Sequence, residues 1–94
     1  MVADLINCYL EETLKLLESM RTGVGRKEAS PLRIAAHTLK SSSAAIGATN
    51  LANLCKDLEA MSRAGRIEGA SEIVLHLEAE YQKVKAALQE YQSS

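Results

Sequence analysis

The sequence predicts an all-α protein, an antiparallel up-down-up-down four-helix bundle, and three observations lead to this prediction. Apolar residues recur at spacings of three and four along most of the chain, which is the period of a helix that buries one face. The composition is rich in Leu, Ala, Glu and Lys, lacks Phe and Trp, and includes a single Pro, so it favours helix over strand. Glycines separate the periodic segments, and the short connections place sequence neighbours side by side.

The first helix is predicted over residues 3–20. The stretch from Thr22 to Gly25 holds two glycines in three residues and is expected to end it. The side chains expected to face the core are Leu5, Ile6, Tyr9, Leu10, Thr13, Leu16, Leu17 and Met20.

The second predicted helix begins at Ser30 and Pro31 and ends at Gly47. Ser30 is a suitable N-cap, and Pro31 would occupy the first helical position, where a missing N–H has no consequence. Gly47 is the expected C-terminal stop. The inward stripe of this helix comprises Leu32, Ala35, Ala36, Leu39, Ser42, Ser43 and Ile46.

Two more helices complete the predicted bundle. The third spans residues 49–63 and ends before Gly65, with Leu51, Leu54, Cys55, Leu58 and Met61 facing inward. The fourth spans residues 68–91, and its core positions follow steps that alternate between four and three, which is typical of nearly antiparallel helix packing. Those positions are Ala70, Val74, Leu77, Tyr81, Val84, Leu88 and Tyr91.

Length and charge limit the function classes. Residues 1–94 make one small domain, and the periodicity reaches both ends, so we expect a module of a longer polypeptide. The net charge of −1 gives no electrostatic case for binding nucleic acid or an anionic membrane. No apolar run approaches the roughly 20 residues of a membrane span, and no signal-peptide pattern opens the chain. Because each helix uses its apolar seam internally, we expect a monomer.

The two cysteines stand outside any CxxC spacing. Cys8 and Cys55 are interpreted as small apolar residues on helix faces, which fits a reduced cytosolic compartment. A zinc site formed by Cys8, Cys55, His37 and His76 stays open as an alternative, since four helices could converge on one ion. The outward direction of His37 argues against it, and no metal is expected.

The candidate functional residue is His37. At about 100° per residue it lies about 200° from Leu39, so it points away from the core. A neutral imidazole with its proton on Nδ1 presents Nε2 as a nucleophile. The nearby cations Arg33 and Lys40 are expected to favour that neutral form, and Lys40 could bond the oxygens of a phosphoryl group on Nε2. The residues that share this outer face are Arg33, Lys40, Ser41 and Ala44.

The sequence shows no recognisable catalytic machinery. It has no glycine-rich phosphate loop and no cluster of paired carboxylates with a histidine, so an independent enzyme is disfavoured. Small side chains at Ser41 and Ala44 instead leave clearance for a partner that supplies the catalytic groups.

A different class of function stays open beside this one. Most surface histidines on helices have no function, and the chain could be a helical interaction module in which His37 is incidental. In that case His37→Gln would leave binding intact. His76, beside the seam of the fourth helix, is interpreted as a structural boundary residue.

The segment from His37 to Ala48 resembles the signature of histidine-containing phosphotransfer (HPt) domains. That signature reads His, any residue, an aliphatic residue, Lys, Gly and then small residues, and it ends in aliphatic-Gly-Ala. This chain matches it with His37-Thr38-Leu39-Lys40 and with Ile46-Gly47-Ala48. The stretch 51–59 followed by Ala64-Gly65, and the first helix with Tyr9-Leu10-Glu11-Glu12 and Leu16-Leu17, resemble the neighbouring segments of the family.

The resemblance implies a phosphorelay carrier of a two-component system. His37 would accept a phosphoryl group from a phospho-aspartate of a receiver domain and pass it reversibly to another receiver. Lys40 would steady the phosphoryl group. The chain would need no cofactor of its own, while Mg²⁺ would sit on the partner receiver. The docking face would comprise Arg33, Ser41, Ala44 and Gly47.

The resemblance also implies a cellular setting. The module would be cytoplasmic and belong to a hybrid sensor histidine kinase anchored in the inner membrane. A variant within the family is the phosphoacceptor domain of a chemotaxis-type kinase, which is phosphorylated directly from ATP.

Ser41 departs from the family pattern, because most members have glycine there. Its hydroxyl could bond back to the His37 carbonyl, as helical serines do. We expect transfer to survive with an altered rate or partner choice. The departure also leaves open a docking module that binds receivers without accepting a phosphoryl group.

Overall fold

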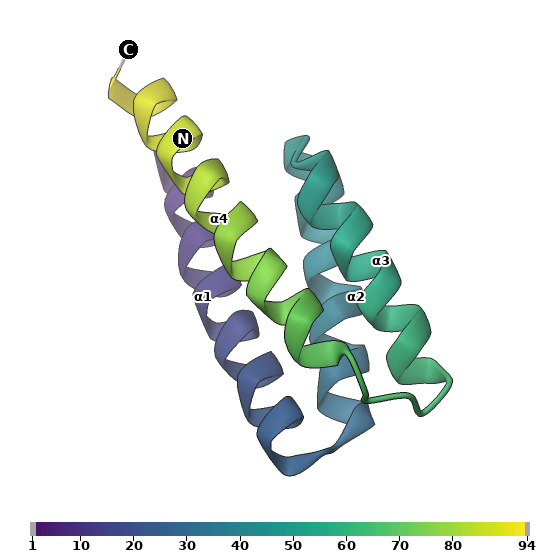
Figure 1. Ribbon diagram of the computed structural model, residues 1–94. Coiled ribbons are helices and arrows are strands. Elements are labelled where there is room, and N and C mark those ends of the chain that lie inside the picture. Colours follow the sequence, from purple (N-terminus) through teal and green to yellow (C-terminus); the bar gives the residue numbers. More distant parts are fainter. Residues whose placement is uncertain (1, 94) are drawn as a thin grey trace.

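The computed structural model describes residues 2–93, with side chains described for residues 4–91, and contains four helices (Figure 1). They are α1 (Val2–Arg26), α2 (Ala29–Ile46), α3 (Thr49–Arg63) and α4 (Ala70–Ser93). Within this part of the chain, α1 packs against α2 and α4, and α3 packs against the same two helices, while no Cα atoms of the diagonal pairs lie within 8 Å of each other. Sequence neighbours are therefore side by side, and the predicted antiparallel four-helix bundle is confirmed.

The bundle is elongated because its first and last helices are long. It measures 43 × 19 × 19 Å along its principal axes. The α2–α3 hairpin is shorter than the α1 and α4 helices beside it (Figure 1). No helix of the described residues is both long enough and apolar enough to cross a membrane.

Buried hydroxyl groups fix the register of the helices. The Tyr9 and Ser43 hydroxyls lie 2.8 Å apart and join α1 to α2, and the Tyr81 hydroxyl donates to the Leu10 carbonyl at 3.2 Å and joins α4 to α1. Thr13 donates to the Tyr9 carbonyl at 2.7 Å. No buried side-chain polar atom among the described residues lacks a partner, so these groups add specificity without an unmet desolvation penalty.

The prediction that the glycines from Thr22 onward end the first helix is wrong, because α1 continues to Arg26. Gly23 serves close packing instead: a Cβ at this position would lie 3.1 Å from Cγ of the buried Leu32 on α2. The helix ends at Lys27, which adopts the left-handed conformation with φ 55°. The Glu28 N–H then donates to the Gly23 carbonyl at 2.9 Å, which is the pattern of a Schellman motif.

The predicted start of the second helix is also wrong, by two positions. The cap position belongs to Glu28, which makes no side-chain cap hydrogen bond, so Ser30 and Pro31 lie in the first turn rather than at the cap and the first position. Proline is tolerated there because the first four N–H groups of a helix have no intrahelical acceptor. The stop at Gly47 is confirmed: its φ is 84° and its N–H donates to the Ala44 carbonyl at 3.2 Å.

Two residues predicted to face the core are exposed. Leu5 is 69% exposed and Tyr91 is 64% exposed, and both lie in the terminal turns of the long helices α1 and α4. Leu5 faces α2 side chains as small as Ser42 and Ala45, and an open cleft remains between the helices. Cys8 borders the same cleft and is exposed, whereas Cys55 is buried.

The left-handed residues that follow α1 and α2 give a matched prediction. Lys27→Gly should raise the free energy of unfolding by about 0.5–1 kcal/mol, because a non-glycine residue is strained at positive φ. Gly47→Ala should lower it by about 1 kcal/mol for the same reason, since open space surrounds Gly47 and only its φ matters. Urea unfolding followed by circular dichroism measures both, and a loss of stability in Lys27→Gly would contradict this account.

Candidate functional site

His37 lies on the outer flank of α2, beside α3. Its side chain is 62% exposed, as the helical spacing predicts. The ring is nevertheless anchored, since Nδ1 lies 2.9 Å from Oε2 of Glu59 on α3. A carboxylate can only accept, so this contact assigns the proton to Nδ1. Nε2 is then the nitrogen with a free lone pair.

Glu59 is the centre of the site. It is 5% exposed and accepts hydrogen bonds on both oxygens. Oε2 receives His37 Nδ1 and Arg63 Nη2, each at 2.9 Å, and Oε1 receives Lys40 Nζ at 2.6 Å. Because a buried carboxylate is costly unless it is paired and hydrogen-bonded, these donors are what permit a charge at this depth.

The electrostatics of the site follow from these contacts. The hydrogen bond from the Lys40 ammonium lowers the pKa of the Glu59 carboxyl, and the hydrogen bond from His37 lowers it further, against the opposite effect of desolvation. The expectation about Arg33 and Lys40 left out this carboxylate, which lies 2.9 Å from the His37 ring. Burial raises the pKa of the nearby Cys55 thiol to about 12, so this cysteine stays protonated and inert.

The other residues of the predicted face lie where the spacing places them. Arg33, Ser41 and Ala44 are exposed on α2 around His37, and Gly47 is exposed at the end of the helix. Lys40 is 35% exposed, with its ammonium turned to Glu59.

The expected hydrogen bond from Ser41 to the His37 carbonyl is absent from the described structure. The neighbouring hydroxyls make such bonds instead: Thr38 donates to the Ile34 carbonyl at 3.0 Å, and Ser42 donates to the Thr38 carbonyl at 3.2 Å. Ser41 itself has no hydrogen-bond partner in this part of the chain.

Sequence reasoning missed Glu59 and Arg63. A signal for Glu59 was present, since it follows Cys55 by one turn and adjoins the buried Leu58, which places it on the inner flank of α3. A charged residue at such a position is almost never buried unless it is paired. Arg63 follows Glu59 at the i+4 spacing that suits an ion pair.

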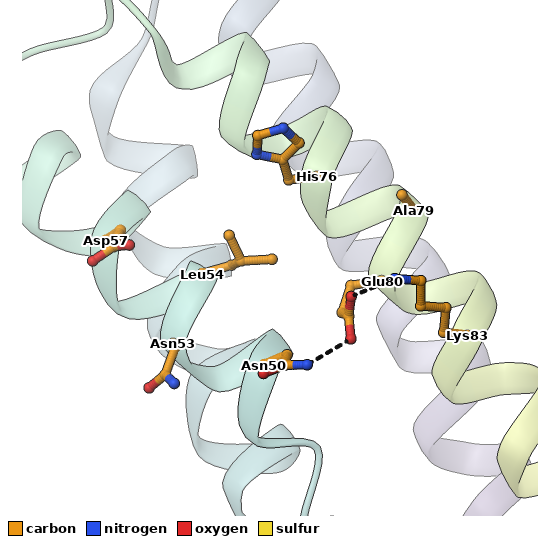
Figure 2. Close-up of a pocket in the computed structure, with 8 residues that line it drawn as sticks. All are labelled: Asn50, Asn53, Leu54, Asp57, His76, Ala79, Glu80 and Lys83. Atoms are coloured by element: carbon orange, nitrogen blue, oxygen red, sulfur yellow. Dashed lines mark hydrogen bonds and ion pairs between the residues drawn. The ribbon is translucent and has the colours of Figure 1, made fainter.

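His76 lies in a different region, an open groove of about 430 Å³ between α3 and α4 (Figure 2). The interactions drawn in that groove centre on Glu80, which accepts from Asn50 at 3.1 Å and pairs with Lys83 at 3.7 Å. His76 is exposed, in keeping with a boundary residue of the fourth helix.

The four donors of the zinc alternative do not come together. Cys8 borders the cleft between α1 and α2, Cys55 is buried in the core, and His76 lines the groove between α3 and α4. In the portion of the chain that the structure describes, no three His, Cys, Asp or Glu side chains are arranged to hold a metal ion.

Comparison with known proteins gives consistent results. The family model described as Hpt domain matches residues 4–87. Histidine-containing phosphotransfer protein 2 from Arabidopsis thaliana is 26% identical over 92 residues, covering 95% of this chain. The chain spans 59% of that relative's length. The crystal structure of histidine-containing phosphotransfer protein B from Pseudomonas aeruginosa superposes with a TM-score of 0.92 at 27% identity, covering 95% of this chain and 77% of the other.

The Glu59 cluster predicts a specific pH dependence of stability. The pKa of Glu59 is lower in the folded protein than its ordinary value of 4.5, so its stabilising contribution is complete above pH 4.5 and is lost as the pH falls through the lower, folded value. Glu59→Gln should therefore cost about 1–2 kcal/mol at pH 7, and the difference from wild type should shrink on acidification below pH 4.5.

Urea unfolding at pH 7 and pH 3 measures this difference. Glu80→Gln is the matched control, because Glu80 also accepts a hydrogen bond from Asn50 and pairs with Lys83, but outside the cluster. A Glu59→Gln difference that is equal at both pH values would contradict the assignment.

Proposed function

Because the chain belongs to the Hpt domain family, whose members are phosphorelay carriers of two-component signalling, we propose that Nε2 of His37 accepts a phosphoryl group from a phospho-aspartate of a receiver domain. The phosphoryl group then passes reversibly to another receiver. The observation that carries this proposal is the exposed imidazole whose Nδ1 is held at 2.9 Å by the buried Glu59.

The transfer step uses the tautomer that Glu59 selects. The Nε2 lone pair attacks phosphorus, the N–P bond forms, and the P–O bond to the receiver aspartate breaks, so that the aspartate leaves as a carboxylate. The proton stays on Nδ1 throughout. The phosphorylated ring therefore carries a positive charge, which the Glu59 carboxylate stabilises across the same hydrogen bond. Glu59 acts as a positioning residue, and transfer in the reverse direction uses the same arrangement.

Lys40 and Arg63 are the cations for the incoming phosphoryl group. Arg63 Nη2 and His37 Nδ1 share one oxygen of Glu59 at 2.9 Å each, so they lie no farther apart than twice that distance. Both cations are bound to Glu59 before transfer. The phosphoryl oxygens bring additional negative charge beside Glu59, and the two cations can bridge between the two anions.

Hpt proteins are phosphocarriers rather than enzymes, and their homologues work with receiver domains. For this chain we propose that Mg²⁺ and the remaining catalytic groups belong to the receiver and that the module itself needs no cofactor, is a cytoplasmic monomer and contacts neither nucleic acid nor membrane. As its setting we propose a hybrid sensor histidine kinase anchored in the inner membrane. The alternative setting is a chemotaxis-type kinase, in which the module would be phosphorylated directly from ATP.

The receiver docks on the face of α2 that surrounds His37. Ile34 is 56% exposed one turn before His37, and Ala44 adds a small apolar surface beyond it. This face continues into a cleft of about 470 Å³ between α1 and α2, lined mainly by apolar atoms. The cleft is lined by Leu5, Cys8, Tyr9, Glu12, Ser42, Ala45 and Ile46. Exposed aliphatic side chains beside a reactive group suit the apolar core of a protein interface.

A second candidate function is a docking module that binds receivers without accepting a phosphoryl group. The observation that favours it is Ser41, which stands one turn after His37 where the family pattern has glycine. The labelling experiment described next distinguishes this docking module from a phosphoryl carrier.

Incubation with a phosphorylated receiver should label this chain on His37. The label should be lost in acid, survive in base and be absent from His37→Gln. His76→Gln is the matched control, because it removes the other exposed histidine and should leave labelling unchanged. Binding to competent receivers with no label on the wild type would favour the docking module instead.

The docking face can be tested separately from the chemistry. Ile34→Ala should raise the dissociation constant for a receiver about tenfold, because a buried aliphatic contact at an interface is lost. Leu75→Ala is the control: Leu75 is 63% exposed on α4, which lies diagonally across the bundle from α2. Calorimetric titration measures both affinities, and equal effects of the two variants would place the docking surface elsewhere.

A further inference from the structure

Ser41 occupies the turn directly after His37. Residues four apart on a helix have Cβ atoms about 5–6 Å from each other. Helical side chains also lean toward the N-terminus, so the Ser41 side chain leans over the turn that carries His37. Both residues are exposed, and the helical spacing places them on the same outer strip of α2.

The hydroxyl of Ser41 differs from its neighbours in being unoccupied. Thr38 and Ser42 donate to carbonyls of the preceding turn, and Ser43 is paired with Tyr9 in the core. In the described structure Ser41 makes no hydrogen bond, although a helical serine commonly donates to the carbonyl four residues earlier. Its exposed O–H is therefore free to donate to a group that comes to the surface.

A phosphoryl group on His37 would supply such an acceptor. The Glu59 contact turns Nδ1 toward α3 and leaves Nε2 as the nitrogen open to a partner. The cations Lys40 and Arg63 are shared with Glu59, at 2.6 and 2.9 Å, so they are not fully available to the phosphoryl oxygens. A neutral donor one turn away adds a hydrogen bond without competing for the carboxylate.

We propose that Ser41 is a phosphoryl-binding residue, whose hydroxyl donates to an oxygen of the phosphoryl group on His37 and thereby stabilises the phosphorylated form. This inference rests on the proposed function, because it needs His37 to be the acceptor. The hydroxyl takes no part in bond making or breaking. It shifts the balance toward retention of the phosphoryl group by this module.

The test uses phosphoramidate, a small donor that loads histidine without any receiver. Nε2 attacks its phosphorus, the N–P bond of the reagent breaks, and ammonia leaves after taking up a proton from water. Docking does not enter this reaction, so it isolates the site chemistry. The full chain is compared as wild type, Ser41→Ala, Ser41→Gly and Ser41→Thr.

The hydroxyl and the Cβ have separable effects in this series. Ser41→Ala removes only the hydroxyl, and its phosphohistidine half-life after removal of the reagent should be shorter by roughly two- to tenfold. Ser41→Gly should match it, whereas Ser41→Thr should retain the wild-type half-life. The pH midpoint of the phosphorus NMR titration should also rise in Ser41→Ala, which a purely structural role would not cause.

The outcomes separate a failure of the proposed function from a failure of the role assigned to Ser41. If His37 is not labelled in the wild type, the proposed function itself fails. If His37 is labelled but Ser41→Ala keeps the wild-type half-life and titration midpoint, this inference is overturned and the Cβ alone distinguishes serine from glycine.

Discussion

The hydrogen bonds to Glu59 are the interaction on which the site depends. One buried carboxylate on α3 orients His37 and holds Lys40, both from α2, and Arg63 from its own helix. The proposed chemistry is therefore confined to the α2–α3 pair. The helices α1 and α4 contribute packing, register and, through α1, an adjoining surface. This division explains how a small bundle can expose an oriented imidazole while Glu59 is the one charged side chain buried among the described residues.

Local sequence patterns were sufficient to predict the helices. The steps of three and four gave the number of helices, and the positive φ of Gly47 was foreseeable because glycine is the residue that tolerates it. The predictions failed where tertiary contacts overrode local preference. Gly23 lies inside a helix because α2 approaches it closely, and Lys27 takes the left-handed position that a glycine would fill with less strain. Neither the helical position of Gly23 nor the left-handed conformation of Lys27 could be predicted from the residues next to it in the sequence.

Only the residues that α2 contributes to the candidate site could be predicted from the sequence. The direction of His37 and the position of Lys40 follow from spacing along α2, because both belong to one periodic segment. Glu59 approaches from a different segment, 22 residues away, and the pairing depends on how α2 and α3 are rotated against each other. The inward position of Glu59 was readable as an unusual buried charge. The residues that pair with Glu59 could not be identified in the same way, since several cations and a histidine could have satisfied its charge.

The anchored ring has a consequence for the entropy of recognition. A histidine on a helix surface ordinarily samples several rotamers, and ordering it on encounter opposes association. Here that ordering takes place during folding, because the Nδ1 contact to the buried carboxylate holds the imidazole in the free protein. Under the proposed function, a receiver would therefore meet an imidazole whose direction is already set, and the free energy of its binding would be available for alignment of the reacting atoms. The orientation of the exposed His37 ring is in this way set by the buried Glu59 carboxylate.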